Sequence, residues 1–202
     1  MKTSKAAQDY AELQVSTNFS FLRGASHAEE LVQTAAALGL AGMGVTDHNT
    51  LAGVVRAHSA ALTVGMPLIV GCRLDLRDGP SCLCFPKDRE AYGRLCRLLT
   101  LGKRRAEKGG CELYLEDLFA AVKNQTLIVL PPENLPAEDE HFEKQLKTFI
   151  TNLDETPYLA AHYLFRGDDR QRLAALASLS SRYSAPLVGM NDVHFHLSLI
   201  HI

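Results

Sequence analysis

Short apolar runs alternate with longer amphipathic segments along almost the whole chain. The runs that predict strands lie at 11–16, 43–46, 68–76, 81–85, 126–130, 158–164 and 187–190. Apolar residues at helical spacing predict helices over 26–38, 51–64, a long stretch that starts at Pro86, 116–122, 138–150 and 168–183. This alternation is typical of an α/β fold with a mainly parallel sheet, either closed into a barrel or left open. About seven strands in so short a chain favour a small barrel.

Several residues predict where these elements begin and end. Ser26 and Glu29 have the spacing of a capping box, with Ser26 as the N-cap, and Gly39 ends the same helix. Asp78-Gly79 is a turn signal, so the strand at 81–85 is expected to form a hairpin with the strand before it. One antiparallel pair is therefore expected in the sheet.

An acid and an imidazole stand side by side where the second predicted strand ends. Asp47 and His48 follow the buried run at 43–46, and the ends of parallel strands are where sites lie in α/β folds. The alternative is structural: Asp47 caps the following turn and His48 is a histidine at the rim of the core. The pair therefore indicates a site only if other polar side chains reach the same end of the fold.

Other candidates do reach that end. Asp192 and His194 follow the last strand and, two residues apart, point the same way from an extended backbone. In a closed barrel the first and last strands pair, which would bring them near Asp47 and His48. These carboxylates and imidazoles suit Zn, Mn or Fe. Arg73 and His162 are also expected near the strand ends.

Composition indicates an ordinary globular domain without a strong electrostatic field. The chain has 202 residues, 47% of them apolar, with a net charge of −2, which fits one domain and no general affinity for nucleic acid. It has neither an apolar run long enough to span a bilayer nor a signal peptide, so a cytoplasmic location and no membrane partner are expected. Its five cysteines are expected to be reduced, and Cys82 and Cys84 to pack in the core rather than bind zinc.

Four stretches resemble one family over roughly residues 9–196. They are Tyr10 to His27, Thr46 to His58, Tyr92 to Arg104 and Leu164 to Arg170. They resemble the PHP domain (polymerase and histidinol phosphatase) at the start of bacterial error-prone DNA polymerases, C-family relatives of the polymerase III alpha subunit. The resemblance implies a distorted (β/α)7 barrel, which in active members carries up to three metals. It divides the chain into a tail at 1–8, a PHP domain at 9–196 and an atypical, truncated end at 197–202.

Three positions depart from the metal-binding pattern that the resemblance implies. Gln14 and Ser16 stand where active PHP domains have a His-x-His pair, and Arg73 stands where they have a glutamate. We expect that the multinuclear centre is not assembled, because losing these ligands should cost more than the loss of a residue that only supports a ligand. Asp47, His48, Asp192 and His194 would remain as a polar network, with Arg73 paired to Asp47 or Asp192. A single weak Zn or Mn site is the alternative.

The resemblance implies a role in translesion synthesis and DNA repair as part of a longer polymerase. The residues that hold the catalytic Mg ions of such a polymerase lie in a palm domain that this chain lacks, so no catalytic residue and no cofactor are expected here. Expected partners are the rest of the polymerase chain, DNA through the full-length protein, and proteins of a mutagenesis complex.

Two other functions stay open. One is a metal-dependent phosphoesterase or 3′–5′ nuclease that uses Asp47, His48, His162, Asp192 and His194 with a metal-activated water. The other is a pure interaction module. The basic run Lys103–Arg105, with Arg94 and Arg97 on the same helix, is expected to be a solvated surface rather than a DNA contact.

Overall fold

The computed structural model describes residues 10–135 and 139–197, so the expected tail at 1–8 and residues 198–202 of the expected atypical end lie outside the described residues. The strands are β1 (Ala11–Val15), β2 (Gly42–Val45), β3 (Leu68–Val70), β4 (Cys72–Leu74), β5 (Cys82–Pro86), β6 (Gln125–Val129), β7 (Tyr158–His162) and β8 (Leu187–Met190). The helices are α1 (Ala28–Ala37), α2 (Val54–Val64), α3 (Arg89–Arg105), α4 (Leu115–Ala121), α5 (Glu140–Asn152) and α6 (Asp169–Tyr183). The expected α/β alternation is confirmed.

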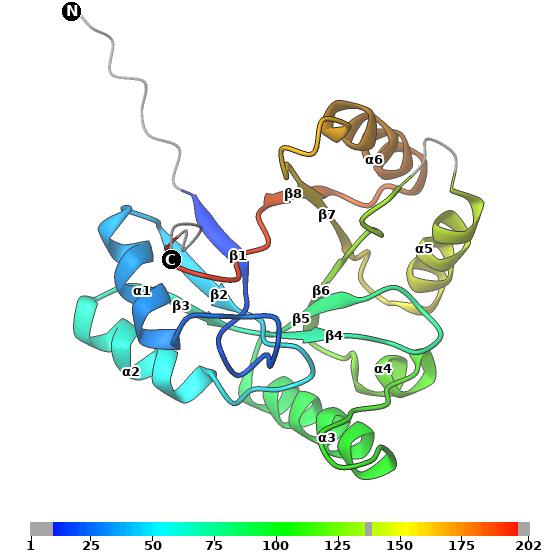
Figure 1. Ribbon diagram of the computed structural model, residues 1–202. Coiled ribbons are helices and arrows are strands. Elements are labelled where there is room, and N and C mark those ends of the chain that lie inside the picture. The colour runs from blue at the N-terminus through cyan, green and yellow to red at the C-terminus, as the bar shows by residue number, and fades with distance from the viewer. Residues whose placement is uncertain (1–9, 136–138, 198–202) are drawn as a thin grey trace, which may run out of the picture.

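The strands form two sheets rather than one. β1, β2 and β3 make a parallel sheet, and β4 to β8 make a second sheet in sequence order. In the second sheet β5 runs antiparallel to both β4 and β6, which confirms the expected hairpin, while β6, β7 and β8 are parallel. Figure 1 shows the helices outside the strands, with α1 and α2 beside the first sheet and α3 to α6 around the second.

The expected closed barrel of seven strands is not confirmed. The predicted strand at 68–76 is two strands, because the chain passes from one sheet to the other at Gly71. A side chain at Gly71 would place its Cβ 2.5 Å from the ring of Phe85, so only glycine allows this close approach. The two sheets are joined by isolated bridges, Val15 to Val193 and His48 to Arg73.

The start of α1 differs from the expected capping box by one residue. His27 is the N-cap, and its backbone N–H donates to the Glu30 carboxylate at 2.8 Å. Ser26 instead bonds to His196: its hydroxyl lies 2.7 Å from the His196 Nδ1 atom and accepts from the backbone N–H of His196 at 2.9 Å. Ser26 thus ties the first helix to the segment after β8.

An apolar layer between the strands supports the polar residues at their ends. It contains Leu83, Phe85, Ile128, Leu130, Ala160 and Met190. Helices α1 and α2 bury a second cluster with Val15, Met43 and Val45, and the remaining helices cover a third cluster outside the second sheet. The polar residues at the strand ends therefore lie against close-packed apolar side chains, which restrict their positions.

Candidate functional site

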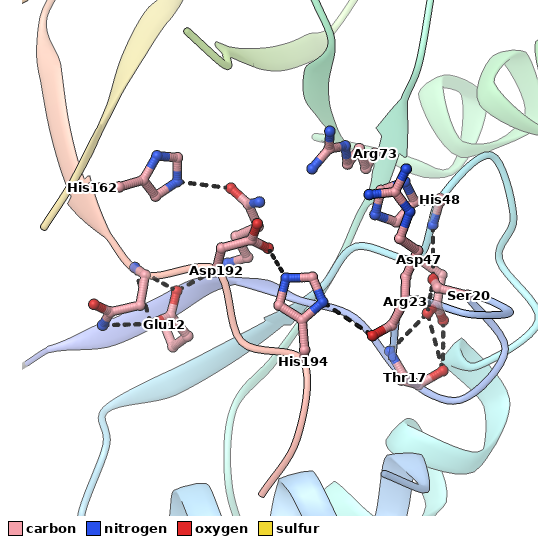
Figure 2. Close-up of polar contacts among 12 residues, drawn as sticks. Glu12, Thr17, Ser20, Arg23, Asp47, His48, Arg73, His162, Asp192 and His194 are labelled. Carbon is pink, nitrogen blue, oxygen red and sulfur yellow. Dashed lines mark hydrogen bonds and ion pairs between the residues drawn. The ribbon is translucent and has the colours of Figure 1, made fainter. Parts of the chain in front are cut away.

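The predicted site residues gather at one end of the strands (Figure 2). The segment after β8 runs beside the end of β1, where the Ser16 N–H donates to the Val193 carbonyl at 2.9 Å and the Val193 N–H donates to the Gln14 carbonyl at 3.0 Å. This pairing brings Asp192 and His194 to the side of the first sheet, as the sequence predicts. The residues nevertheless form separate polar contacts, and these differ from the arrangement that a metal centre needs.

Asp47 is fully buried and holds the loop after β1. Its carboxylate accepts from the Thr17 N–H at 2.8 Å, from the Thr17 hydroxyl at 2.9 Å and from the Ser20 hydroxyl at 2.6 Å. A Cβ at Gly53 would lie 2.4 Å from the same carboxylate, so there is no space on that side either. Asp47 therefore anchors the loop after β1, whereas the structural alternative expected it to cap the turn that follows Asp47 itself.

His48 belongs to a short chain of polar side chains with Asp75 and Arg73. The His48 Nδ1 atom lies 2.8 Å from Asp75 Oδ2, and Arg73 Nε donates to Asp75 Oδ1 at 2.9 Å. Burial would raise the pKa of Asp75, but the bond from His48 and the charge of Arg73 hold that pKa well below its usual range. The expected pairing of Arg73 with Asp47 or Asp192 is wrong, because Asp75 lies two residues along and shares its face of the chain.

Gln14 occupies the space beside His162. The His162 Nε2–H donates to Gln14 Oε1 at 3.0 Å, and both side chains are buried. Burial lowers the pKa of His162 to about 4, so the ring is neutral at neutral pH. Gln14 thus satisfies one of the two ring nitrogens of His162.

Asp192 and His194 form an ion pair at the front of the site. His194 Nε2 lies 3.2 Å from Asp192 Oδ1, and His194 Nδ1 donates to the Arg23 carbonyl at 3.1 Å. The contact with Asp192 raises the pKa of His194, since both ring nitrogens face acceptors and favour the protonated ring. Burial would raise the pKa of Asp192, but His194 lowers it on balance. Both ring nitrogens of His194 already face protein acceptors, so a metal could bind this ring only if one of these contacts broke.

The donor set does not fit the multinuclear centre that the fold implies. No group of three or more His, Cys, Asp or Glu side chains in the described ranges 10–135 and 139–197 is arranged to hold a metal ion. Among the described residues at this end, the His48 Nε2 atom is buried without a hydrogen-bond partner. The arrangement therefore supports a hydrogen-bonded polar end of the fold better than a reactive one.

Sequence reasoning missed two residues that organise this site. Asp75 joins His48 to Arg73, and Ser20 connects the Asp47 carboxylate to the His48 backbone N–H at 3.0 Å. Asp75 could have been found from its two-residue spacing after Arg73 in an extended segment. Ser20 lies in a loop, and its sequence carries no signal for this contact.

The cysteines of β5 and the basic residues of α3 also make defined contacts. Cys82 and Cys84 are free thiols buried in the core, as predicted. Among the basic residues of α3, Arg105 donates two hydrogen bonds to the Asp117 carboxylate, at 2.7 and 3.1 Å, and Arg94 donates to the Lys123 carbonyl. These two arginines are thus engaged within the fold, and the solvated surface expected for the basic residues of this helix stays a prediction.

Nothing in the described ranges suggests a membrane-spanning helix. Each helix there is either too short or too polar to cross a bilayer.

Comparison with solved structures shows the same fold elsewhere. A proposed metal-dependent phosphoesterase from Bifidobacterium adolescentis superposes with a TM-score of 0.68 over 93% of this chain and 88% of its own, at 17% identity. An amidohydrolase from Chromobacterium violaceum, whose structure holds sulfate and no metal, has a TM-score of 0.66 over 92% of this chain and 87% of its own, at 16% identity. At these identities the similarity shows the fold alone.

Comparison with curated proteins gives much closer relatives. The error-prone DNA polymerase of Caulobacter vibrioides is 52% identical over 188 residues, which cover 93% of this chain and 17% of the polymerase. The error-prone DNA polymerase of a Bradyrhizobium species is 44% identical, with the same two coverages. The chain thus spans about a sixth of the length of these relatives. The family model of the PHP domain matches residues 12–163, and the chain belongs to the PHP domain family.

Proposed function

We propose that this chain is the PHP domain of an error-prone DNA polymerase that acts in translesion synthesis and DNA repair in the cytoplasm. The observation that carries the proposal is the 52% identity to the Caulobacter vibrioides polymerase across 93% of the chain. This identity extends over 188 residues and is far higher than a shared fold alone requires. DNA, the remainder of the polymerase and proteins of a mutagenesis complex would be reached through the full-length protein.

Within that polymerase the domain serves as a scaffold with a degenerate metal site. The carboxylate of Asp47 accepts hydrogen bonds from Thr17 and Ser20, and the side chain of Gln14 accepts one from the His162 ring. Arg73 adds a positive charge at the strand ends and is held there by Asp75. These contacts fix loops and strand ends without an ion, so they suit a structural role.

A chimeric polymerase tests the proposed parent. In it, this chain replaces the matching region of the Caulobacter vibrioides polymerase, and the chimera is expressed in a strain that lacks the native enzyme. We expect the chimera to restore mutagenesis after DNA damage, because the replaced region differs at about half of its positions yet keeps the same fold. A matched chimera with an unrelated domain of similar size controls for expression. A stable, full-length chimera that restores no mutagenesis would contradict the proposal.

A metal-dependent phosphoesterase or 3′–5′ nuclease is the second candidate. It is favoured by the gathering of His48, His162, Asp192 and His194 at one end of the strands, together with the unpartnered His48 Nε2 atom. The available ligand atoms argue against this candidate, since His162 and His194 each already use ring nitrogens in hydrogen bonds to protein atoms. Metal-dependent turnover of a phosphoester that Asp192→Asn abolishes would favour this function over the scaffold.

A further inference from the structure

An apolar groove lies between β1, α1 and the segment that follows β8. It encloses about 300 Å³. Its floor belongs to the cluster under α1 and α2 and includes Val15, Leu31, Ala35 and Met43. Its rim carries Leu38 and Phe195, which are 71% and 50% exposed. Large apolar side chains around a hollow with an apolar floor are typical of a surface that another element covers.

The groove offers little to an anionic ligand, because its one lining imidazole, His196, already contacts Ser26 and lies 3.7 Å from the Glu30 carboxylate. No lysine or arginine is among the described residues that line it, and the one lining carboxylate, Glu12, is already engaged. Glu12 accepts from the Tyr10 hydroxyl at 2.9 Å, from the Gln14 N–H at 3.1 Å and from the Asn191 side chain at 3.0 Å. Nucleic acid does not fit this surface, because proteins bind its phosphates through lysine and arginine side chains. The occupant must bring apolar side chains.

The surrounding fold favours a helix as that occupant. The edge of β1 near the groove is already paired with the segment around Val193, so a further strand cannot add there. Figure 1 shows α1 outside the first sheet and α6 outside β7, with no described helix between them over β8 and β1. In an alternating α/β fold that outer position is one that a helix covers.

We propose that this groove receives the apolar face of an amphipathic helix from the part of the parent polymerase that lies outside this chain. The inference rests on the proposed function, because it is the length of the related polymerases that makes such a helix available: this chain covers 17% of them. Helix docking of this kind inserts side chains at i, i+3 and i+4 spacing into an apolar groove. The contact would fix the domain against the rest of the polymerase.

Hydroxyl-radical footprinting, read by mass spectrometry, compares the isolated chain with the full-length chimera. The oxidation rate of Leu38 should be lower by a factor of about five or more in the chimera, because the core of such a contact is closed to water. Leu62 on α2 is the matched control, since it is also 71% exposed but lies outside the groove, and its reactivity should stay the same. Equal reactivity of Leu38 in the two proteins would overturn the proposal. So would protection in the isolated chain that grows with concentration, which indicates a second copy of this chain.

A pair of variants provides a second readout. Leu38→Asp should shift the unfolding midpoint of the chimera downward and leave that of the isolated chain unchanged, whereas Leu62→Asp should change neither. An equal effect of the two variants in the chimera would contradict docking at this groove. A chimera that restores mutagenesis while Leu38 stays reactive overturns the docking alone, and a chimera that protects Leu38 without restoring mutagenesis overturns the proposed function alone.

Discussion

Replacing Asp47 with alanine is expected to lower the free energy of unfolding by at least ~3 kcal/mol, because it leaves three buried donors without an acceptor. The donors are the Thr17 N–H, the Thr17 hydroxyl and the Ser20 hydroxyl. Denaturation in urea measures the change. Asp154→Ala is the control, since Asp154 is exposed, and it should alter stability by less than about 0.5 kcal/mol.

The same experiment separates an anchoring role of Asp47 from a metal-binding role. If Asp47 is an anchor, Asp47→Ala lowers the free energy of unfolding by the same amount with a chelator present or absent, because the partners of Asp47 are protein atoms. If the wild-type protein loses its advantage over Asp47→Ala when metal is removed, Asp47 is a ligand and the structural interpretation is wrong.

Acid is expected to destabilise the protein through His162, by roughly 3 kcal/mol between pH 6.5 and pH 4. Burial lowers the pKa of His162 from its ordinary 6.5 to about 4 in the folded state. Between these values the unfolded chain binds the proton and the folded chain does not, so stability falls as the pH falls. Well above pH 6.5 the His162 ring is neutral in both the folded and the unfolded state, so its contribution to stability no longer changes with pH.

His162→Gln isolates this effect, because an amide can still donate to Gln14 but does not titrate. The quantity to compare is the difference in unfolding free energy between wild type and variant across the pH range. It should shrink toward acid pH, and His58→Gln, a change at an exposed ring, should leave the wild-type pH dependence intact. A difference that stays constant with pH would show that His162 is not buried as a neutral ring.

Much of the fold follows from local patterns. The run at 187–190 is β8 at the predicted bounds, and the turn at Asp78-Gly79 leads into the predicted hairpin of β4 and β5. The separation of β3 from β4 could not be predicted in this way. It depends on the ring of Phe85 lying against Gly71, a contact between residues distant in sequence.

The site shows the same division. Its location at the strand ends could be predicted, since Asp47, His48, Asp192 and His194 all follow strands and do lie at one end of the fold. Their partners could not, because Thr17, Ser20 and Arg23 approach from a loop whose path is set by tertiary contacts. The positive charge of Arg73 was expected at this end, but the carboxylate that holds it is Asp75, which is not among the predicted site residues.

In the proposed scaffold role, side chains of the chain itself occupy the positions that would otherwise hold ions. Metal content measures this most directly. The protein is purified without chelators, loaded with Zn, Mn and Fe, desalted and analysed by plasma mass spectrometry. Far less than one ion per chain is the predicted result, because Gln14, Thr17, Ser20 and Arg23 already bond to His162, Asp47 and His194. Two or more tightly held ions per chain, lost in Asp192→Asn, would contradict it.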